Sequence, residues 1–272
     1  MNLRYITLRL VRHFMPDDLA RALLRRRVII CPGLETSEPE TAAGRYRNVL
    51  EGSGASLRDK RVMVFGYGGS FALGCLLLRQ GAGHVVLCDK FAPPDEERNR
   101  LLLPKYTQYL MEEDGKVQPL PEFITLLQAD IREVQEEAVD IVLTSSVYEH
   151  LDDVEGITHA LARLTCGGGM HLHYVDLRDH YFKYPFEMLT FSQRTWQRWL
   201  NPTSNLNRYR IPDYRRAFEQ CFEQVEIQVL ASEPQAYEKA RKRIRPEFSS
   251  GDLELDTATL IRVVAFNPLR VA

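Results

Sequence analysis

The sequence has few of the features that mark secreted, zinc-bound or membrane-spanning proteins. Its five cysteines are odd in number and include no CxxC pair. This pattern argues against a disulfide framework and a zinc site, and it favours a reducing, cytoplasmic location. No apolar run reaches the roughly 18 residues that a membrane span needs. Arg interrupts the first apolar stretch and no small-residue cleavage site follows it, so we expect no signal peptide.

An excess of charge of one sign is also missing. The chain has 35 Lys and Arg against 37 Asp and Glu, which gives a formal net charge of −2. No overall field draws such a chain to nucleic acid, so we expect no nucleic-acid partner. The basic residues are unevenly distributed, because residues 1–30 carry seven Arg against two Asp. A basic helix with an apolar face in this region could cover a pocket, contact a partner or lie on a membrane surface.

The composition is that of a globular protein, with 44% apolar and 26% charged residues in a chain of 272. This length suits one large α/β domain with an attached cap, or two small domains. Leu3, Ile6, Leu10 and Phe14 recur at the spacing of one helix face. A second helix is expected over 17–27 and a third over 38–51. We therefore predict an N-terminal helical cap over residues 1–56.

From residue 57 onward, strand and helix patterns alternate. We expect strands over 60–65, 84–88, 123–128, 139–144, 170–175, 225–231 and 259–266. Helices are expected over 70–80, 93–111, 154–165 and 212–222, and the glycines at 167–169 should end the helix over 154–165. Such units predict right-handed crossovers, whereas the last strand can only hairpin back beside its predecessor. The predicted fold of residues 57–272 is α/β: a doubly wound, mostly parallel, seven-stranded Rossmann-like sheet with an antiparallel C-terminal strand.

The strongest local signal is RVMVFGYGGSFALGCLLLRQGAGHVVLCD, residues 61–89. A buried strand runs into glycines and then into a helix, so the backbone can approach a ligand closely. Asp89 ends the next strand and is placed to accept hydrogen bonds from ribose hydroxyls. A dinucleotide fold needs a third glycine where Phe71 stands. A GxGxG turn beginning at Gly66 needs only a small residue, which is Ser70.

In this order, the motifs resemble those of the class I S-adenosylmethionine-dependent methyltransferases, over about residues 57–266. Ala129-Asp130-Ile131 resembles the pair that flanks adenine, and Ser145–Leu151, with its Glu-His pair, resembles the segment after the fourth strand. The family usually has an acid where Val64 stands, so the amino group of the cofactor must find other acceptors. The cofactor-binding residues that the resemblance implies are Gly66, Tyr67, Gly68, Ser70, Asp89, Lys90, Asp130, Ile131, Ser145 and Ser146.

The resemblance implies that S-adenosylmethionine is the cofactor and that its methyl group passes to a small molecule, such as a sugar, a secondary metabolite or a lipid precursor. O-methylation is the expected reaction, with N- and C-methylation left open. His150, His180 and Asp176 are the candidate general bases, in falling order of preference. The structural alternative is that His150 only helps to start a helix. Asp176, Asp179 and His180 form an Asp/His grouping of a kind that can bind metal, but its spacing is not that of a zinc site, so we expect no metal site.

A long aromatic and basic insert spans about residues 177–211 and should overhang the pocket. Its substrate-side candidates are Tyr184 and Trp196, which could pack against an acceptor, and Arg208 and Arg210, which could hold a carboxylate or phosphate. The alternative is a structural lid whose aromatic residues fill a small core of their own.

Two other functions compete with methyl transfer. One is an NAD(P)-dependent oxidoreductase on a dinucleotide-binding fold, against which Phe71 and the C-terminal strand pair speak. The other is a non-catalytic scaffold that binds S-adenosylmethionine, for which Val64 is the only indication.

Overall fold

The computed structural model describes residues 3–16, 19, 37–135, 137–180, 184–203 and 205–269. Apart from residue 19, the helix predicted over 17–27 lies outside these residues. No helix within the described ranges combines the length and the apolar character needed to cross a bilayer.

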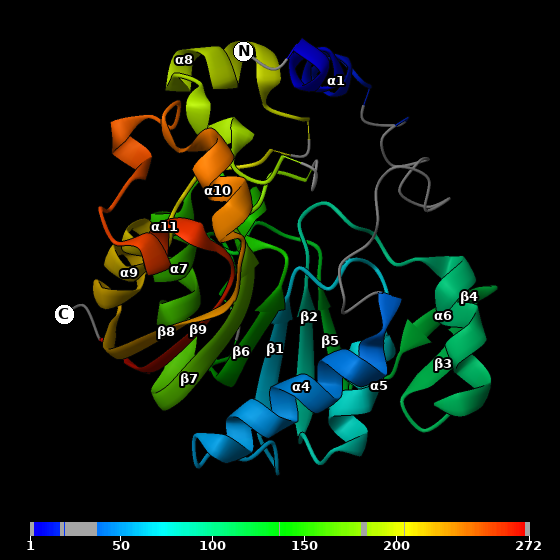
Figure 1. Cartoon of the computed structure of the whole chain (residues 1–272). Helices are drawn as coiled ribbons and strands as arrows, with labels where there is room; N and C mark the ends of the chain where they lie inside the picture. Colours follow the sequence, from blue (N-terminus) through cyan, green and yellow to red (C-terminus); the bar gives the residue numbers. More distant parts are fainter. Residues whose placement is uncertain are drawn as a thin grey trace.

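A seven-stranded sheet forms the centre of the molecule, in the order β5-β2-β1-β6-β7-β9-β8 (Figure 1). All neighbouring pairs are parallel except those of β9, which runs antiparallel to both β7 and β8. The predicted sheet is therefore confirmed, with the last strand inserted between two earlier ones. The strands are β1 (Arg61–Phe65), β2 (His84–Cys88), β5 (Ile124–Leu127), β6 (Val139–Ser145), β7 (Thr165–Asp176), β8 (Phe222–Ser232) and β9 (Ala258–Pro268).

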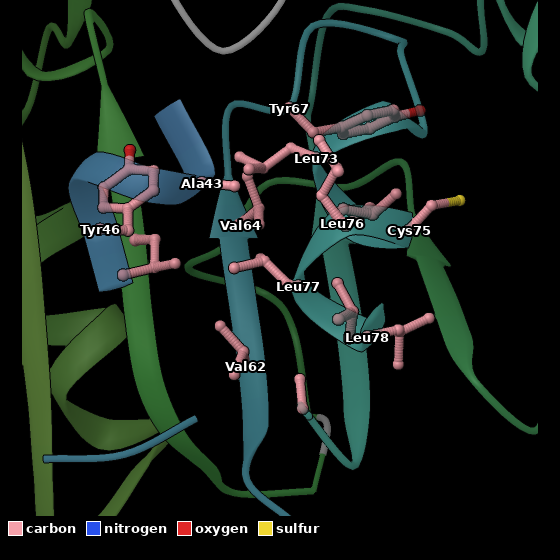
Figure 2. Close-up of a cluster of buried hydrophobic side chains, with 14 of the residues drawn as sticks. Ala43, Tyr46, Val62, Val64, Tyr67, Leu73, Cys75, Leu76, Leu77 and Leu78 are labelled. Carbon is pink, nitrogen blue, oxygen red and sulfur yellow. The ribbon is translucent and has the colours of Figure 1, made fainter. Parts of the chain in front are cut away.

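Helices cover both faces of the sheet, and the alternation of side chains along β1 shows how. Val62 and Val64 face α4 and α5, where they pack among Tyr46 and Leu77 (Figure 2). The alternate residues of β1 join a second core beneath α7 and α9. A strand buried on both faces reads as a continuous apolar run, which is why the sequence reveals it. The helices are α4 (Pro39–Gly52), α5 (Ala72–Arg79), α6 (Glu96–Leu102), α7 (Val154–Arg163), α9 (Ile211–Glu219), α10 (Pro234–Arg241) and α11 (Leu253–Thr257).

A small hairpin replaces the end of the helix predicted over 93–111. The helix α6 stops at Leu102, and β3 (Leu110–Glu113) pairs with β4 (Lys116–Pro119) in antiparallel fashion. The turn residues Asp114 and Gly115 have φ angles of 51° and 72°. Two positive φ angles are what a tight hairpin turn requires, and an Asp-Gly pair supplies them at low cost. The Asp-Gly pair was the local signal for this hairpin.

The glycines at 167–169 also differ from expectation, because they lie inside β7 and do not end α7. A Cβ atom on Gly169 would lie 2.5 Å from Thr165 Cγ2 and 2.8 Å from the Asp140 carbonyl oxygen. The register of β6 against β7 is irregular at this point, between Val139 and Ile141. The close approach of the two strands explains the need for glycine there.

The helix α1 (Leu3–His13) packs through a face that includes only part of the predicted one. Tyr5 and Arg9 are buried, whereas Leu3 and Phe14 are 69% and 65% exposed. Ile6 and Leu10 are partly buried against a third apolar cluster that includes Trp196, from the insert. In the insert lie η3 (Glu187–Thr190), α8 (Gln193–Thr195) and the π-helical turn η4 (Trp196–Leu200), next to α1 (Figure 1). The division into a cap and a catalytic domain, and contact of α1 with a membrane, stay predictions.

Candidate functional site

The turn after β1 is built from glycines in the left-handed region. Gly66, Gly68 and Gly69 have φ angles of 82°, 65° and 84°. A Cβ atom on Gly66 would lie 2.4 Å from Cγ2 of Val147, which follows β6. A residue with a side chain would be strained at these angles and would clash with that neighbour. The turn therefore brings bare backbone to the carboxyl ends of β1 and β6.

Asp89, at the end of β2, points toward this turn. Its Oδ2 accepts a hydrogen bond from the backbone N–H of Gly68 over 3.2 Å. Its Oδ1 accepts hydrogen bonds from the N–H groups of Phe91 and Ala92, both at 2.8 Å. The N–H of Gly66 donates to the Cys88 carbonyl oxygen at 2.7 Å and ties the two strand ends together. The carboxylate and the glycine turn thus form one unit, as a ribose-binding acid requires.

A buried asparagine of α6 fastens the other side of the turn. Asn99 Nδ2 donates to the Gly69 carbonyl oxygen, and Asn99 Oδ1 accepts from the Phe71 N–H, both at 2.9 Å. Its side chain is fully buried. Asn99 was not predicted, because no local sequence pattern links it to Phe71 and Gly69, which lie 28 and 30 positions earlier.

Two residues of the predicted cofactor set are buried within the turn. The ring of Tyr67 stacks on Phe71 in the core beneath the turn, and burial raises the pKa of Tyr67 to about 12. Ser70 is 7% exposed, and its Oγ accepts from the Ala72 N–H at 3.4 Å. Both residues therefore offer their backbone to the turn.

Beside Asp89, the residues predicted on the adenine side form a charged cluster. Asp130 Oδ2 lies 3.0 Å from Lys90 Nζ and 2.6 Å from an Arg132 nitrogen. The hydrogen bonds from Arg132 hold the pKa of Asp130 well below its usual range. Ile131 is buried in the second core. The structure thus places Asp89, Lys90 and Asp130 next to one another at the ends of β2 and β5.

At the end of β6, Ser145 meets an arginine that sequence reasoning did not single out. Arg45 of α4 donates to Ser145 Oγ at 3.2 Å, and its guanidinium lies 3.5 Å from the ring centroid of Tyr174. The Nε of Arg45 is buried and has no hydrogen-bond partner among the described residues. Ser146 has a φ of 57°, which is uncommon for a residue with a side chain and typical of functional sites.

Two of the predicted bases meet next to a buried glutamate. Glu149 and His150 lie on the turn η2 (Tyr148–His150), and ligand atoms of Glu149, His150 and His180 all lie within 4.8 Å of one another. The His150 and His180 ring centroids are 4.9 Å apart. Burial raises the pKa of Glu149 well above its ordinary range. The third predicted base, Asp176, is instead held by Arg178 at 2.7 Å.

The predicted substrate residues of the insert have mostly structural partners. Trp196 is 2% exposed and donates to the Leu206 carbonyl oxygen, and Tyr184 lies edge-on to Tyr5. Arg208 donates to the Met188 and Phe191 carbonyl oxygens. Arg210 donates to three carbonyl oxygens, those of Leu177, Asp256 and Ala258. These contacts favour the alternative of a structural lid with its own core.

A cavity of about 370 Å³ lies between this lid and the segment that follows η2. Trp196 and Arg208 line part of it, together with Leu151 and Asn205. The cavity is therefore separate from the glycine turn and lies on the side of the lid residues.

Comparison with known proteins agrees with this arrangement. Residues 68–173 match the family model of a methyltransferase domain. A candidate sarcosine dimethylglycine methyltransferase from Galdieria sulphuraria is 14% identical, with a TM-score of 0.51 over 84% of this chain and 85% of that one. A candidate O-methyltransferase from Nostoc punctiforme PCC 73102 is 13% identical, with a TM-score of 0.50 over 84% of this chain and 56% of that one. No curated protein sequence matches the chain.

The two structural likenesses show a shared fold. The family match begins at Gly68, within the glycine turn, and includes β2, β5, β6 and most of β7. The matched segment therefore contains Gly68, Asp89, Asp130 and the turn η2. The chain therefore contains a match to a methyltransferase domain over residues 68–173, and this segment supplies four strands of the seven-stranded sheet.

Proposed function

We propose that the protein transfers the methyl group of S-adenosylmethionine to an oxygen atom of a small acceptor molecule. The observation that carries this proposal is the contact between Gly68 and Asp89. It places a fixed carboxylate beside a backbone turn that side chains cannot fill, and these are the two features that an adenosyl group needs. The cofactor supplies a methyl group already activated on a sulfonium sulfur.

Different residues around the turn would contact different parts of the cofactor. Asp89 would hold the ribose hydroxyls, and Asp130 with Ile131 would flank the adenine. Arg45 and Ser145 would face the methionine part, where Val64 leaves no acid. An arginine suits the carboxylate of that part, because its planar fork matches a carboxylate in two parallel hydrogen bonds. The buried Nε of Arg45 gives it a donor not yet used by the described residues.

The acceptor would lie between Ser145 and the pair His150 and His180, below the lid. The Nδ1 atom of His150 contacts the Asn205 carbonyl oxygen at 2.8 Å, so that nitrogen must carry the hydrogen. The lone pair is then on Nε2, which can take the proton of an acceptor hydroxyl. A positioned base of this kind accelerates a reaction about 10²–10⁴-fold.

We further propose that α1 and the insert together cover the acceptor side. Tyr5 and Arg9 of α1 both contact Asp179, and all three side chains are buried. Because Asp179 precedes His180, the position of α1 is coupled to the position of a predicted base.

Turnover of S-adenosylmethionine carrying a labelled methyl group, with extracts fractionated by size, tests the function. We expect the labelled methyl group in a small molecule, bonded to an oxygen atom, together with release of S-adenosylhomocysteine. Label on nitrogen or carbon would refute the O-methylation, and label only in protein or nucleic acid would refute the small acceptor. Cofactor binding without turnover of any fraction would support the scaffold alternative.

A further inference from the structure

Glu149 carries a carboxyl group in an unusual position. The residue is 2% exposed, and neither carboxylate oxygen has a hydrogen-bond partner among the described residues. Burying a carboxylate without partners is costly, so such a group is neutralised by a proton or paired with a cation. The methyl-transfer site described above does not use Glu149.

The turn that carries Glu149 is held rigidly by two asparagines of the insert. Asn207 Nδ2 donates to the carbonyl oxygens of Tyr148 at 2.7 Å and Leu151 at 3.0 Å. The Asn207 N–H donates to the Glu149 carbonyl oxygen at 2.8 Å, and Asn205 Nδ2 donates to that of His150 at 3.0 Å. Side chains on a turn fixed in this way are preorganised, which is what a metal site requires of its ligands.

The histidine next to Glu149 has the orientation of a metal ligand. Its Nδ1 donates to the Asn205 carbonyl oxygen, which leaves the lone pair on Nε2. Histidines that bind metals almost always donate their other ring nitrogen to a carbonyl or a carboxylate. His180 lies just after the end of β7. The preceding residue, Asp179, forms a buried ion pair with Arg9.

We propose that Glu149, His150 and His180 form a binding site for one divalent transition-metal ion. Two imidazole nitrogens and one carboxylate oxygen are the donors that Zn²⁺ takes in sites with an open coordination position. Ligands of one tetrahedral Zn²⁺ lie roughly 3.3–3.6 Å apart. The donor atoms here lie within 4.8 Å of one another, so binding of the ion requires the three side chains to move closer together.

The charges around the site permit a cation. Three arginines act on His180: Arg9 is paired with Asp179 and Arg178 with Asp176, whereas Arg12 donates to Thr203 Oγ1 at 3.2 Å. The carboxylate of Glu149 supplies one of the two negative charges that would neutralise the ion. No local sequence pattern predicts this site, because its ligands are two adjacent residues and one residue thirty positions later.

The role of the ion rests on the proposed function. With the ion bound, the lone pair of His150 Nε2 is held by the ion, so the ion replaces this histidine as the group that activates the acceptor. The acceptor hydroxyl oxygen would occupy the open position and lose its proton to solvent. Its lone pair would then form the O–CH₃ bond as the S–CH₃ bond breaks, and the products would be the methyl ether, S-adenosylhomocysteine and one proton. A bound metal ion favours this step because it lowers the pKa of an oxygen ligand.

Calorimetry with Zn²⁺ on the full chain without an affinity tag, after dialysis against a chelator, tests the site. We expect one Zn²⁺ per chain, and visible absorption bands of a nitrogen- and oxygen-liganded ion when Co²⁺ is used instead. We expect Zn²⁺ binding to weaken by more than about 100-fold in each of the variants Glu149→Gln, His150→Gln and His180→Gln. Loss of a residue that only hydrogen-bonds to a metal ligand lowers metal affinity by about 10–100-fold. His159→Gln, on the exposed face of α7, should change it less than twofold.

Wild-type Zn²⁺ affinity in the three ligand variants, or no binding by the wild-type chain, would overturn the site. Circular dichroism shows whether each variant is folded, and the three variants provide independent tests. S-adenosylhomocysteine binding, measured in the same samples, separates the two proposals. Binding of Zn²⁺ without binding of S-adenosylhomocysteine would refute the proposed function and leave the metal site. Binding of S-adenosylhomocysteine without binding of Zn²⁺ would refute only the metal site. Methyl transfer that is unchanged by the chelator would overturn the role of the ion with the acceptor.

Discussion

The backbone N–H of Gly68 donates to the carboxylate of Asp89, and the 3.2 Å contact joins the turn after β1 to the end of β2. The two residues are 21 positions apart and meet because β1 and β2 are parallel and in register up to Phe65 and Cys88. Parallel neighbours end at the same edge of a sheet, so the crossover through α5 returns the chain to the starting edge. The geometry of the candidate cofactor site thus follows from the sheet topology.

Replacement of Gly66 tests how tightly the turn is packed. Gly66→Ala places a side chain at a φ of 82° and 2.4 Å from Val147 Cγ2. Gly54→Ala is the matched control, since Gly54 has a φ of 73° with open space around it. We expect the control to lower the free energy of unfolding by about 1–2 kcal/mol and Gly66→Ala by about 1–3 kcal/mol more. Equal losses in urea unfolding would show that Val147 does not restrict the turn.

The buried ion pair between α1 and the lid should be essential for stability. Arg9 and Asp179 are 1% and 0% exposed. Arg9→Ala leaves Asp179 buried without its partner cation, so we expect a loss of about 3–5 kcal/mol in the free energy of unfolding. Arg4→Ala, on the exposed side of the same helix, should change it by less than about 0.5 kcal/mol. Similar losses in the two variants would contradict this account of the anchor.

Acid should destabilise the protein through two buried histidines. His171 and His173 are linked to each other at 3.2 Å and to Thr165 and Thr144, and burial lowers the pKa of His171 to about 3. The unfolded chain binds a proton below about pH 6.5, whereas folded His171 stays neutral, so stability falls as pH decreases from about 6.5 toward 3.

The slope of unfolding free energy against pH measures this effect. Each such histidine contributes up to about 1.4 kcal/mol per pH unit below its unfolded pKa. We expect His171→Gln to reduce the wild-type slope between pH 6 and 5 by about that amount. Identical slopes for the two proteins would mean that His171 is protonated in the folded state.

Arg45 should distinguish the methionine part of the cofactor from its nucleoside. It reaches Ser145 from α4, on the side of the turn away from Asp89 and Asp130. We expect Arg45→Met to weaken S-adenosylhomocysteine binding by about 1.5–3 kcal/mol, the contribution of hydrogen bonds to a charged group. Adenosine, which lacks the carboxylate, should bind the variant and the wild type alike. Equal losses for both ligands in calorimetry would place Arg45 elsewhere in the site.

The sequence predicts the sheet well, because its strands are buried on both faces and appear as apolar runs. Asp89 and the glycine turn could be predicted for the same reason, since they directly follow such strands. Asn99, Arg45 and the meeting of His150 with His180 could not, because each depends on packing between distant segments. The apolar face of α1 was predicted in part: Ile6 and Leu10 pack against the third cluster, whereas Leu3 and Phe14 are exposed and Arg9 is buried in an ion pair with Asp179.

Calorimetric titration of the wild-type chain and Asp89→Ala with S-adenosylhomocysteine and with NAD tests the central claim most directly. We expect the wild type to bind S-adenosylhomocysteine and not NAD, and Asp89→Ala to lose about 1.5–3 kcal/mol of that binding. Asp114→Asn, in the distant hairpin turn, should bind like the wild type. Tight binding of NAD alone, or full S-adenosylhomocysteine affinity in Asp89→Ala, would contradict the assignment of Asp89 and the glycine turn to an adenosyl sulfonium cofactor.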